Sequence, residues 1–502
     1  MTLLVETGTF TKETSNVDGT DQTVTLVDST LTPKVLWLWA TSNTSNATFA
    51  DDLVFSYGFS DGTDDACVAC IAEDGIPSSD TSGVIRNDSC ICIQDANTPN
   101  TTSARASVVS FGAGQFVLDW AVSDAVGIII HYMVAGGTDI TNVKVLNTTV
   151  ATTAIGDQGY TGVGFQGDFI NTIIGHHAQT INTPTGNAVV WQCNIGFATS
   201  SSDEFAWGGH SEDGSGSSEA SHLVKPGSII FSSEAGSADD LLMAASFVSF
   251  GADGFTFNYS NGPDASTQVF SALVIKGGLW NVGTGAVPSP TGNQTITTTS
   301  GRDPEGVMMF TWGTTTTDTA DTFAAHMRFC IGAADNALHE NCISTHDTAS
   351  AGTMVTTMFS SVTKIIHAHT ANATASSSTT LAEADIVDMD NDGNFIINWT
   401  TTLNGMRYAW FAVSKVFGGE PPAAPTDIRR PLVINVTDVL NVQWSKNIRP
   451  TIRVFGARVK DLIENFTRRY LRKWVSFSNP ILARLVDKSS TLHQDSTQLI
   501  RL

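Results

Sequence analysis

The run GGHSEDGSGSSEASH at residues 208–222 brings together side chains that can perform acid–base and nucleophilic chemistry. His210, Ser211, Glu212 and His222 lie close enough along the chain for an imidazole to activate a hydroxyl. The run is also rich in Gly and Ser, which is typical of an exposed turn. No nucleophile elbow, phosphate-binding loop or zinc-protease motif accompanies it. We therefore predict an exposed turn, no catalytic residue and a chain that is not an enzyme.

A second run, DMDNDG at residues 388–393, matches the opening of a calcium-binding loop. Asp388, Asp390 and Asp392 would offer carboxylate oxygens, which calcium prefers, and a glycine follows them. The twelfth position of such a loop is Trp399, where a bidentate Glu is needed. A hairpin turn is the preferred interpretation and calcium binding is the alternative. We assign no metal site and no cofactor.

Two histidine pairs could also carry chemistry. His367 and His369 would point to one face of a strand, where they could bind a metal across a symmetry axis. Histidines that are hydrogen-bonded or solvent-facing are the simpler interpretation. His176 and His177 would point to opposite faces of a strand and would not share a site.

The seven cysteines form an odd set, so at least one must stay unpaired within the chain. Cys67 and Cys70 are spaced C-x-x-C, whereas Cys90 and Cys92 are spaced C-x-C in an apolar run. Structural zinc sites usually pair two C-x-x-C turns. Buried thiols packed in strands are therefore preferred over a zinc site.

The elements that must position these residues recur three times. Glycine pairs at 136–137, 277–278 and 418–419 lie 141 residues apart, and each follows an apolar run. About 20 residues upstream of each pair, an alternating run begins with Phe and ends with an aromatic residue: Phe116 to Trp120, Phe255 to Tyr259 and Phe395 to Trp399. The sequences IAEDG (71–75), HSEDG (210–214) and, more weakly, ISTHD (343–347) also recur. Landmarks in the same order at a fixed period indicate a triplicated domain.

Each copy consists of short alternating segments bounded by Gly, Asn, Asp, Ser and Thr, which are typical of β-strands. The sequence therefore predicts a mainly β protein with three tandem β-sandwich domains of jelly-roll-like form, at 1–140, 141–280 and 281–419. Copies of this length are large enough to be self-sufficient domains. The run VLWLWA at 35–40 is apolar on both faces and predicts a central strand that is covered on each side.

Residues 420–502 form a C-terminal segment of different chemistry that begins with the Pro-rich linker EPPAAP. Residues 421–502 carry a net charge of +8, whereas residues 1–420 carry −31. The spacing predicts an amphipathic helix at about 457–475, with one apolar stripe made of Val459, Leu462, Ile463, Phe466, Tyr470 and Trp474. Packing against protein is the preferred role of this helix; a membrane surface and nucleic acid are the alternatives. We expect no nucleic-acid partner and no membrane span.

The whole chain carries a net charge of −23 and is rich in Asp and poor in Lys. Such a surface suits a halophilic source, and an ordinary acidic protein is the equal alternative. Met1 to Phe10 lack the basic and apolar regions of a signal peptide, and no run of 18 apolar residues occurs. Sequons such as those at Asn43 and Asn147 make glycosylation feasible and no more.

Four runs carry a resemblance to a known group: TGTFTK (7–12), QTVTLVDSTLTPKVLWLWAT (22–41), FGAGQFVLDW (111–120) and HYMVAGGTDITNVKV (131–145). Together they resemble the repeated β-domains of minor tail, fibre or other virion-surface proteins of tailed viruses, whether phage or archaeal virus. The resemblance covers residues 1–419 and rests on pattern. It is weaker in the second copy, where GFQGDF stands at 164–169.

The resemblance implies a non-enzymatic structural protein of the virion, which we expect to be a tail fibre or baseplate component that contacts the host surface. It implies a homo-oligomer that meets other virion proteins through its C-terminal segment and a glycan or protein of the host. A capsid decoration or turret protein is the alternative within this class. A cell-surface carbohydrate-binding protein or glycoside hydrolase is the alternative from another class, and a hydrolase would need a carboxylate pair in one cleft.

Overall fold

The computed structural model describes two units, Met1–Gly418 and Gly419–Leu502. In the first unit it describes residues 2–416 apart from gaps at 99, 151–154, 176–179, 186–190, 217–218, 235–239, 263–267, 314–322, 349–351, 371–377 and 392. In the second unit it describes only β33 (Val433–Ile434) and β34 (Ile500–Arg501), which pair antiparallel. The predicted helix at 457–475 lies outside the described residues, as do the stripe residues Val459, Leu462, Ile463, Phe466, Tyr470 and Trp474. That helix stays a prediction.

The described part of the first unit is built of strands. The first copy holds β1 (Leu3–Thr11), β2 (Thr20–Thr25), β3 (Pro33–Ala40), β4 (Thr48–Asp51), β5 (Leu53–Ser60), β6 (Asp65–Ala72), β7 (Thr81–Arg86), β8 (Ile91–Gln94), β9 (Thr102–Gly112), β10 (Gln115–Val122) and β11 (Ile129–Gly137). The second copy holds β12 (Ile140–Thr149), β13 (Gly156–Thr161), β14 (Phe169–Ile174), β15 (Trp191–Ser200), β16 (Asp203–Ser211), β17 (Ala220–Pro226), β18 (Ile230–Glu234), β19 (Asp240–Gly251), β20 (Gly254–Asn261) and β21 (Val269–Gly277). The third copy holds β22 (Leu279–Ala286), β23 (Gly292–Thr297), β24 (Pro304–Thr311), β25 (Ala324–Ala325), β26 (Met327–Asp335), β27 (Glu340–Asp347), β28 (Thr356–Ser361), β29 (Ile366–Thr370), β30 (Thr379–Asn391), β31 (Asn394–Thr401) and β32 (Arg407–Ser414).

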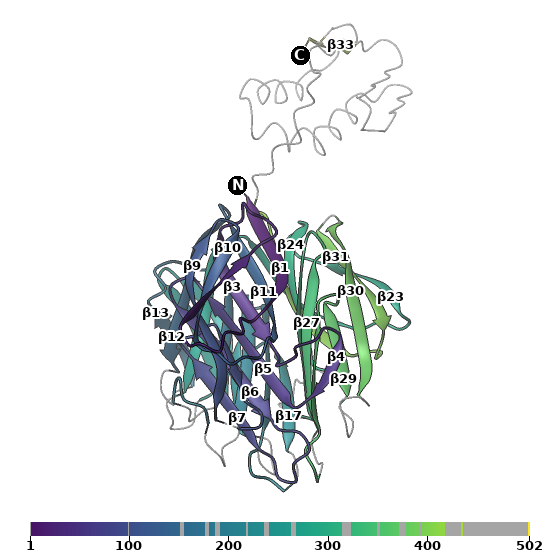
Figure 1. The fold of residues 1–502 in the computed structure, drawn as a ribbon. Helices are drawn as coiled ribbons and strands as arrows, with labels where there is room; N and C mark the ends of the chain where they lie inside the picture. The colour runs from purple at the N-terminus through teal and green to yellow at the C-terminus, as the bar shows by residue number, and fades with distance from the viewer. Residues whose placement is uncertain are drawn as a thin grey trace. The chain divides into compact units, whose positions relative to one another are not determined.

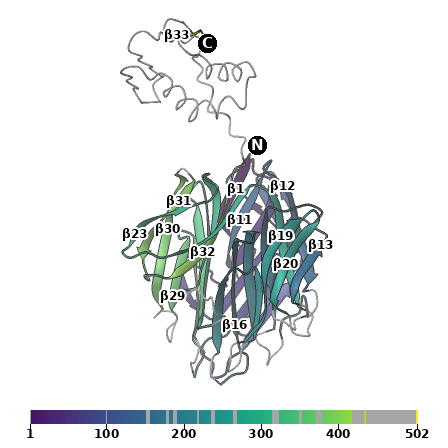
Figure 2. The same ribbon diagram turned by 180° about the vertical axis from the view of Figure 1, so that it is seen from behind.

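Two kinds of antiparallel sheet recur in each copy. The larger sheets run β1-β11-β3-β5-β6-β7, then β12-β21-β14-β15-β16-β17 with β25 added, then β22-β32-β24-β26-β27-β28 with β4 added. The smaller sheets run β2-β10-β9-β8, β13-β20-β19-β18 and β23-β31-β30-β29. The strand order is the same in all three copies. Because the described part of the first unit consists of strands, the expectation of a mainly β protein is confirmed. Figure 1 shows the larger sheet of the first copy beside the strands of the third, and Figure 2 shows the second and third copies from behind.

The glycine pairs mark the points where the chain passes from one copy to the next. β11 ends at Gly137 and β12 begins at Ile140; β21 ends at Gly277. Gly137 and Gly277 have φ angles of +89° and +91°, which side chains rarely adopt. A Cβ atom would also lie 2.3 Å from the Thr2 carbonyl oxygen at Gly137 and 1.9 Å from that of Asp139 at Gly277. Backbone conformation and close approach therefore both require glycine here.

Strand β3 is covered on both faces, as its composition predicts. Val35, Trp37 and Trp39 point into one apolar cluster, whereas Leu36 and Leu38 point into another. This follows from the alternation of side chains along a strand, since both faces of the sheet are buried. The prediction of a central, doubly covered strand is confirmed.

The two clusters on either side of β3 differ in which copies build them. The outer cluster lies between the larger and the smaller sheet of the first copy, and matching clusters lie in the second and third copies. The inner cluster draws residues from all three copies, for example Trp37, Phe169 and Phe411. The ring centroids of Trp37 and Phe411 are 5.9 Å apart, and those of Phe169 and Phe411 are 5.0 Å apart. Each copy thus packs its own outer core, but the central core needs all three.

Candidate functional site

The four residues singled out in the 208–222 run do not form one site. His210 lies in β16 and is fully buried, so the expectation of an exposed turn is wrong for His210 and Ser211. The imidazole Nδ1 of His210 contacts Ser233 Oγ at 2.8 Å and its Nε2 contacts Ser221 Oγ at 2.7 Å. His222 donates from Nδ1 to the backbone oxygen of His326 at 2.5 Å. Both imidazoles therefore make hydrogen bonds within the protein. Their partners lie on or beside neighbouring strands, which the sequence pattern did not identify.

Glu212, the remaining member of the run, follows the end of β16 and is half-buried. Burial and the neighbouring Glu219 carboxylate raise its pKa. Its partner is thus another carboxylate and not one of the two histidines. The hydrogen bonds of His210 go to Ser221 of the same run and to Ser233, so they pair the imidazole with neither Ser211 nor Glu212.

The recurring EDG sequence holds the first copy to the third. Asp74 Oδ1 accepts a hydrogen bond from the backbone N–H of Thr356 at 2.7 Å, at the start of β28. The next residue, Gly75, donates its N–H to the Met354 oxygen at 3.0 Å, and the Met354 N–H returns a bond to the Ile76 oxygen at 2.9 Å. We call this set of three bonds the Asp-Gly clasp.

The same clasp holds the second copy to the first. Asp213 Oδ1 accepts from the Thr81 N–H at 2.8 Å. Gly214 donates to the Ser79 oxygen at 2.7 Å, and the Ser79 N–H bonds to the Ser215 oxygen at 2.9 Å. Gly75 and Gly214 have φ angles of +73° and +71°, which explains why glycine follows the aspartate in each motif. The motif is therefore a joint between copies.

Each copy also extends an arm onto the larger sheet of a neighbour. Strand β4 of the first copy pairs with β28 of the third, and β25 of the third pairs with β17 of the second. Residues 182–185 of the second copy reach β7 of the first, where the Asn182 N–H bonds to the Ile85 oxygen at 2.9 Å and the Thr185 N–H to the Gly83 oxygen at 2.8 Å. The three arms run from first to third, third to second and second to first. The copies are thereby joined in a closed ring.

Two further aspartates hold the first copy to the third and to the second. Asp335 Oδ2 accepts from the Thr7 N–H at 3.0 Å, and Asp61 Oδ2 accepts from the Val145 N–H at 2.8 Å. Thr7 and Val145 occupy equivalent positions in the first strands of their copies, since they pair with Met133 and Leu273 in β11 and β21. A charged acceptor makes a stronger hydrogen bond than a neutral one, so these contacts fix the sheets in register with each other.

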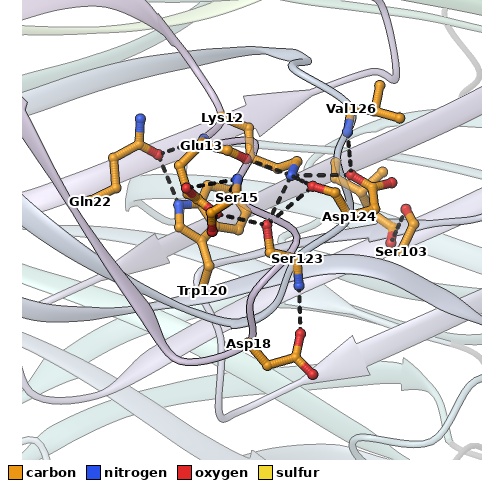
Figure 3. A network of polar contacts seen from close by, with 11 residues as sticks. Lys12, Glu13, Ser15, Asp18, Gln22, Ser103, Trp120, Ser123, Asp124 and Val126 are labelled. Carbon is orange, nitrogen blue, oxygen red and sulfur yellow. Dashed lines mark hydrogen bonds and ion pairs between the residues drawn. The ribbon is translucent and has the colours of Figure 1, made fainter.

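A buried lysine organises a network that belongs to the first copy alone. Lys12 is 1% exposed, and its ammonium group contacts the Glu13 oxygen at 2.8 Å, Ser123 Oγ at 3.1 Å and the Asp124 oxygen at 2.7 Å. It also lies 3.1 Å from Asp124 Oδ1 and 5.6 Å from the centre of the Trp120 ring (Figure 3). These acceptors satisfy the ammonium protons. The lysine therefore ties β1 to the loop that follows β10.

Lys12 directly follows the first strand of its copy, and valine takes its place in the other two. The backbone N–H groups of Lys12, Val150 and Val287 all bond to a carbonyl next to the last strand of their copy. The network is therefore an addition to the common scaffold. A lone lysine where the other copies have valine was the sequence signal for it.

Three carboxylates stand at equivalent positions, two of them buried and that of Glu340 partly buried, and sequence reasoning missed them. Asp65, Glu204 and Glu340 lie at the start of β6, β16 and β27. Each accepts a hydrogen bond from a backbone N–H of the smaller sheet in its copy: Val108 at 3.2 Å, Phe247 at 2.5 Å and Ile386 at 2.6 Å respectively. Each of these N–H groups lies beside a shift in the strand register. Burial raises the pKa of Asp65 to about 6, that of Glu204 to about 7 and that of Glu340 to about 8. The repeated acid at the start of an apolar strand was the available signal.

Asp347 is another buried carboxylate, and its hydrogen-bond partners are poorer. It ends β27, at the position that Ala72 holds in β6 and Ser211 holds in β16. Its side chain is fully buried, and among the described residues no well-formed hydrogen bond reaches either carboxylate oxygen. Burial raises its pKa to about 7 despite a stabilising contact with the Ser211 hydroxyl, and the Asp74 carboxylate adds to the rise.

The 388–393 run lies at a hairpin, which confirms the preferred interpretation. β30 ends at Asn391, β31 begins at Asn394, and Gly393 between them has a φ of +86°. The Gly393 N–H bonds to Asp303 Oδ1 at 2.8 Å. The side chains of Asp390 and Asp392 lie outside the described residues, whereas Asp388 lies within β30. Among the described side chains, no group of three His, Cys, Asp or Glu residues could hold a metal ion.

His367 and His369 share one face of β29, as their spacing predicts. The Nδ1 atoms of both contact Ser344 Oγ, at 3.0 and 2.8 Å. Both side chains are 2% exposed, and their other nitrogens contact Thr380 and Thr357. The interpretation of hydrogen-bonded histidines is confirmed. His176 and His177 lie outside the described residues.

The cysteines are buried and unpaired, including Cys67, Cys70, Cys90 and Cys92. All four lie in or beside strands of the first copy, and burial raises the pKa of each thiol. The interpretation of buried thiols in strands is confirmed.

An open cavity of about 410 Å³ lies in the third copy and is lined in part by Arg302, Glu305, Asn336 and Lys415. Its polar groups bind one another, since Lys415 Nζ lies 2.5 Å from Glu305 Oε1 and Asn336 donates to Glu305 Oε2 at 2.6 Å.

Among the described segments, none is a helix of the length and apolarity that a membrane span requires. Comparison with models of known protein families, with curated proteins and with solved structures finds no match for this chain.

Proposed function

We propose that the chain is a non-enzymatic structural protein of a tailed virus particle, displayed at the surface of the virion. The preferred place is a tail fibre or baseplate that contacts the host, and a capsid decoration or turret protein is the second candidate. In this proposal each copy is a jelly-roll-like sandwich, and residues 420–502 attach the body to other virion proteins.

One observation carries the proposal: the three arms and the Asp-Gly clasps join the copies in a closed ring. β4, β25 and residues 182–185 each cover the edge of a neighbouring sheet. Covered edges cannot pair with other chains, which suits a protein that is crowded with copies of itself. The joints and the shared core make a rigid body of the kind that a particle surface requires.

The charges of the two parts support a division of labour. Residues 1–420 carry −31 and residues 421–502 carry +8. Like-charged bodies repel one another and stay soluble at high local density, whereas a basic segment is attracted to an acidic surface. The predicted stripe at 459–474 would supply the apolar contact in the docked state.

The proposal is tested by locating the protein in particles. Antibodies raised against residues 1–418, coupled to gold and applied to purified particles, should label the tail tip in electron micrographs. Labelling spread over the capsid would favour the decoration or turret role. Particles whose proteins, identified by mass spectrometry, do not include this chain would overturn the proposal.

The attachment role is tested by two variants of the predicted helix. Leu462→Ser with Phe466→Ser interrupts the apolar stripe, and Lys460→Ser is the matched control on the polar face. The stripe variant should fold, as judged by circular dichroism, but should be missing from particles. The control should be incorporated like the natural protein. Incorporation of both variants at the natural level would contradict docking through the stripe.

A further inference from the structure

The joint between the second and third copies contains an unusual number of imidazoles. Here β25 pairs with β17 through two residue pairs, and the His326 N–H bonds to the Ala220 oxygen at 2.9 Å. His222 of β17 donates to the His326 oxygen across the same joint. His326 has a φ of +70°, a conformation that residues other than glycine adopt at a cost. Within the described residues, few backbone bonds hold the arm to β17, and the arm leads into β26 under strain.

More imidazoles lie behind this arm. The ring centres of His326 and His346 are 5.7 Å apart, those of His346 and His369 are 6.2 Å apart, and those of His369 and His367 are 5.6 Å apart. Arg328 Nε donates to His346 Nε2 at 3.3 Å, which requires that nitrogen to be unprotonated. We call His222, His326, His346, His367 and His369 the histidine cluster.

The charges that face the cluster are mostly positive. Burial and the Arg328 guanidinium hold the pKa of His346 well below its ordinary range. Burial lowers the pKa of His222 to about 4 and that of His369 to about 3. The pKa of His367 is lowered well below its ordinary range by burial, the neighbouring His369 and Lys364.

Every element packed around the cluster contributes to this balance. Among the described residues, the titratable and charged groups come from several strands and the segments beside them: His210 on β16, His222 on β17, His326 and Arg328 on either side of the start of β26, His346 on β27, His367 and His369 on β29, Lys364 just before β29, Glu383 and Asp385 on β30, and Asp51 on β4. Glu383 and Asp385 are each 2.7 Å from Lys364 Nζ and are thus engaged with it. Asp51 is exposed, and Asp347 follows His346 directly, so it points to the opposite face of β27. The charged neighbours that shift the pKa values of His222, His346 and His369 are therefore cations.

We propose that the joint between β17 and β25 opens when the histidine cluster takes up protons, and that it opens before the joint between the first and second copies. Added protons place positive charges side by side around Arg328, among imidazoles that are mostly buried, and His346 loses its ability to accept the Arg328 bond. Solvation of these imidazoles then requires the arm to leave β17. The bonds of the joint at Asp213 and Thr81 involve a carboxylate and backbone groups and no imidazole, so protonation of the histidine cluster does not act on them.

The direction follows from linkage. The imidazoles are neutral in the closed joint and have an ordinary pKa near 6.5 once exposed, so closure is fully stable above about pH 6.5 and weakens as the pH falls below it. At pH 5 each imidazole that gains a proton on opening raises the opening equilibrium roughly 30-fold over its neutral-pH value. Three such imidazoles together raise it on the order of ten thousand-fold.

The experiment is hydrogen exchange of the full chain, read by mass spectrometry at pH 7.5 and pH 5.0 and corrected for the intrinsic exchange rate. Peptides from β17 and from 323–330 should lose at least a hundred-fold of their protection at pH 5.0. Peptides from β7 and from 212–216 should keep theirs. Equal loss in both joints would mean general acid unfolding and would overturn the proposal, as would full protection of β17 at pH 5.0.

A variant separates protonation from other effects of acid. His369→Gln keeps an amide that can bond to Ser344 and Thr357 but cannot titrate, and it should reduce the effect of pH 5.0 on β17 exchange roughly 30-fold. His131→Gln is the matched control, because His131 is equally buried but lies between the first and third copies. An equal reduction in both variants would overturn the assignment to the cluster.

A second measurement uses the unaltered protein, in case the glutamine variant does not fold. The Cys330 sulfur in β26 accepts the His367 N–H at 3.3 Å and lies beside the cluster. Labelling with 4,4′-dithiodipyridine, which reacts in acid, should modify Cys330 at pH 5.0 well before Cys92 of the first copy. Simultaneous labelling of both thiols would contradict a local opening.

Discussion

Replacement of Asp347 by Asn should make the protein more stable in alkaline solution. The carboxylate is fully buried, and no well-formed hydrogen bond reaches it among the described residues. Its pKa is raised to about 7 from the value of 3.8 that it has when exposed. The folded protein therefore keeps a proton that the unfolded chain gives up as the pH rises above 3.8. Stability is thus highest below that value and is lost as the pH rises to about 7.

The size of the effect follows from the shift. A difference of about three pKa units corresponds to about 4 kcal/mol of unfolding free energy above pH 7. At pH 5 only about one unit of that interval has been crossed, so the cost is roughly 2 kcal/mol. The substitution Asp347→Asn would remove this cost at both pH values, because an amide of the same shape does not ionise. The gain over the natural protein should therefore increase by about 2 to 3 kcal/mol between pH 5 and pH 8.

Urea unfolding followed by tryptophan fluorescence measures this gain. With a urea dependence on the order of 3 kcal/mol per molar, Asp347→Asn should raise the midpoint at pH 8 by roughly 1 M. Asp335→Asn is the matched control, since Asp335 is also buried but accepts bonds from the Thr7, Ala337 and His339 backbone N–H groups. It should lower the midpoint at both pH values. An unchanged midpoint for Asp347→Asn at pH 8, or a gain that does not depend on pH, would refute the reasoning.

Three further changes test other parts of the ring. Asp74→Ala leaves the Thr356 N–H without its acceptor and should cost about 1 kcal/mol, with faster hydrogen exchange at that amide and no change at β7. Lys12→Val imitates the other copies but leaves the Asp124 carboxylate and two carbonyl groups without their donor. The free energy of unfolding in urea should therefore fall by roughly 2 kcal/mol, and a stabilised variant would contradict the network. Glu340→Gln keeps an acceptor for the Ile386 N–H and removes a carboxyl whose pKa is raised to about 8. Its melting temperature should exceed that of the natural protein by a margin that increases from pH 5 to pH 9, and a constant margin would count against burial as the cause.

Local patterns were enough to predict the strands and the triplication. The alternation from Phe116 to Trp120 became β10, whose side chains alternate between buried and half-buried. The doubly apolar run at 35–40 became β3, which separates two cores. These predictions succeed because the pleat of a strand gives each residue a face, so burial on one or both faces is written directly in the order of residue types.

The joints between copies were beyond local pattern. His210 was interpreted as part of a turn because Gly and Ser follow it, yet it lies in a strand between Ser221 and Ser233. The EDG motif was recognised as a recurrence, but its bonds run from Asp74 to Thr356 and from Asp213 to Thr81. Such partners are more than a hundred residues away along the chain. Their identity depends on how three sheets close around one core.

By itself, the sequence indicated that β-rich segments recur three times and that a basic segment follows an acidic body. The tertiary structure decided which copy reaches which neighbour, and therefore which polar groups are buried. Asp347 shows the physical reason. It stands where the other copies have Ala72 and Ser211, and its pKa is raised by burial inside the closed ring and by the Asp74 carboxylate of the first copy. A carboxylate has an ordinary pKa in any exposed strand, so only the packing of the copies could set this one.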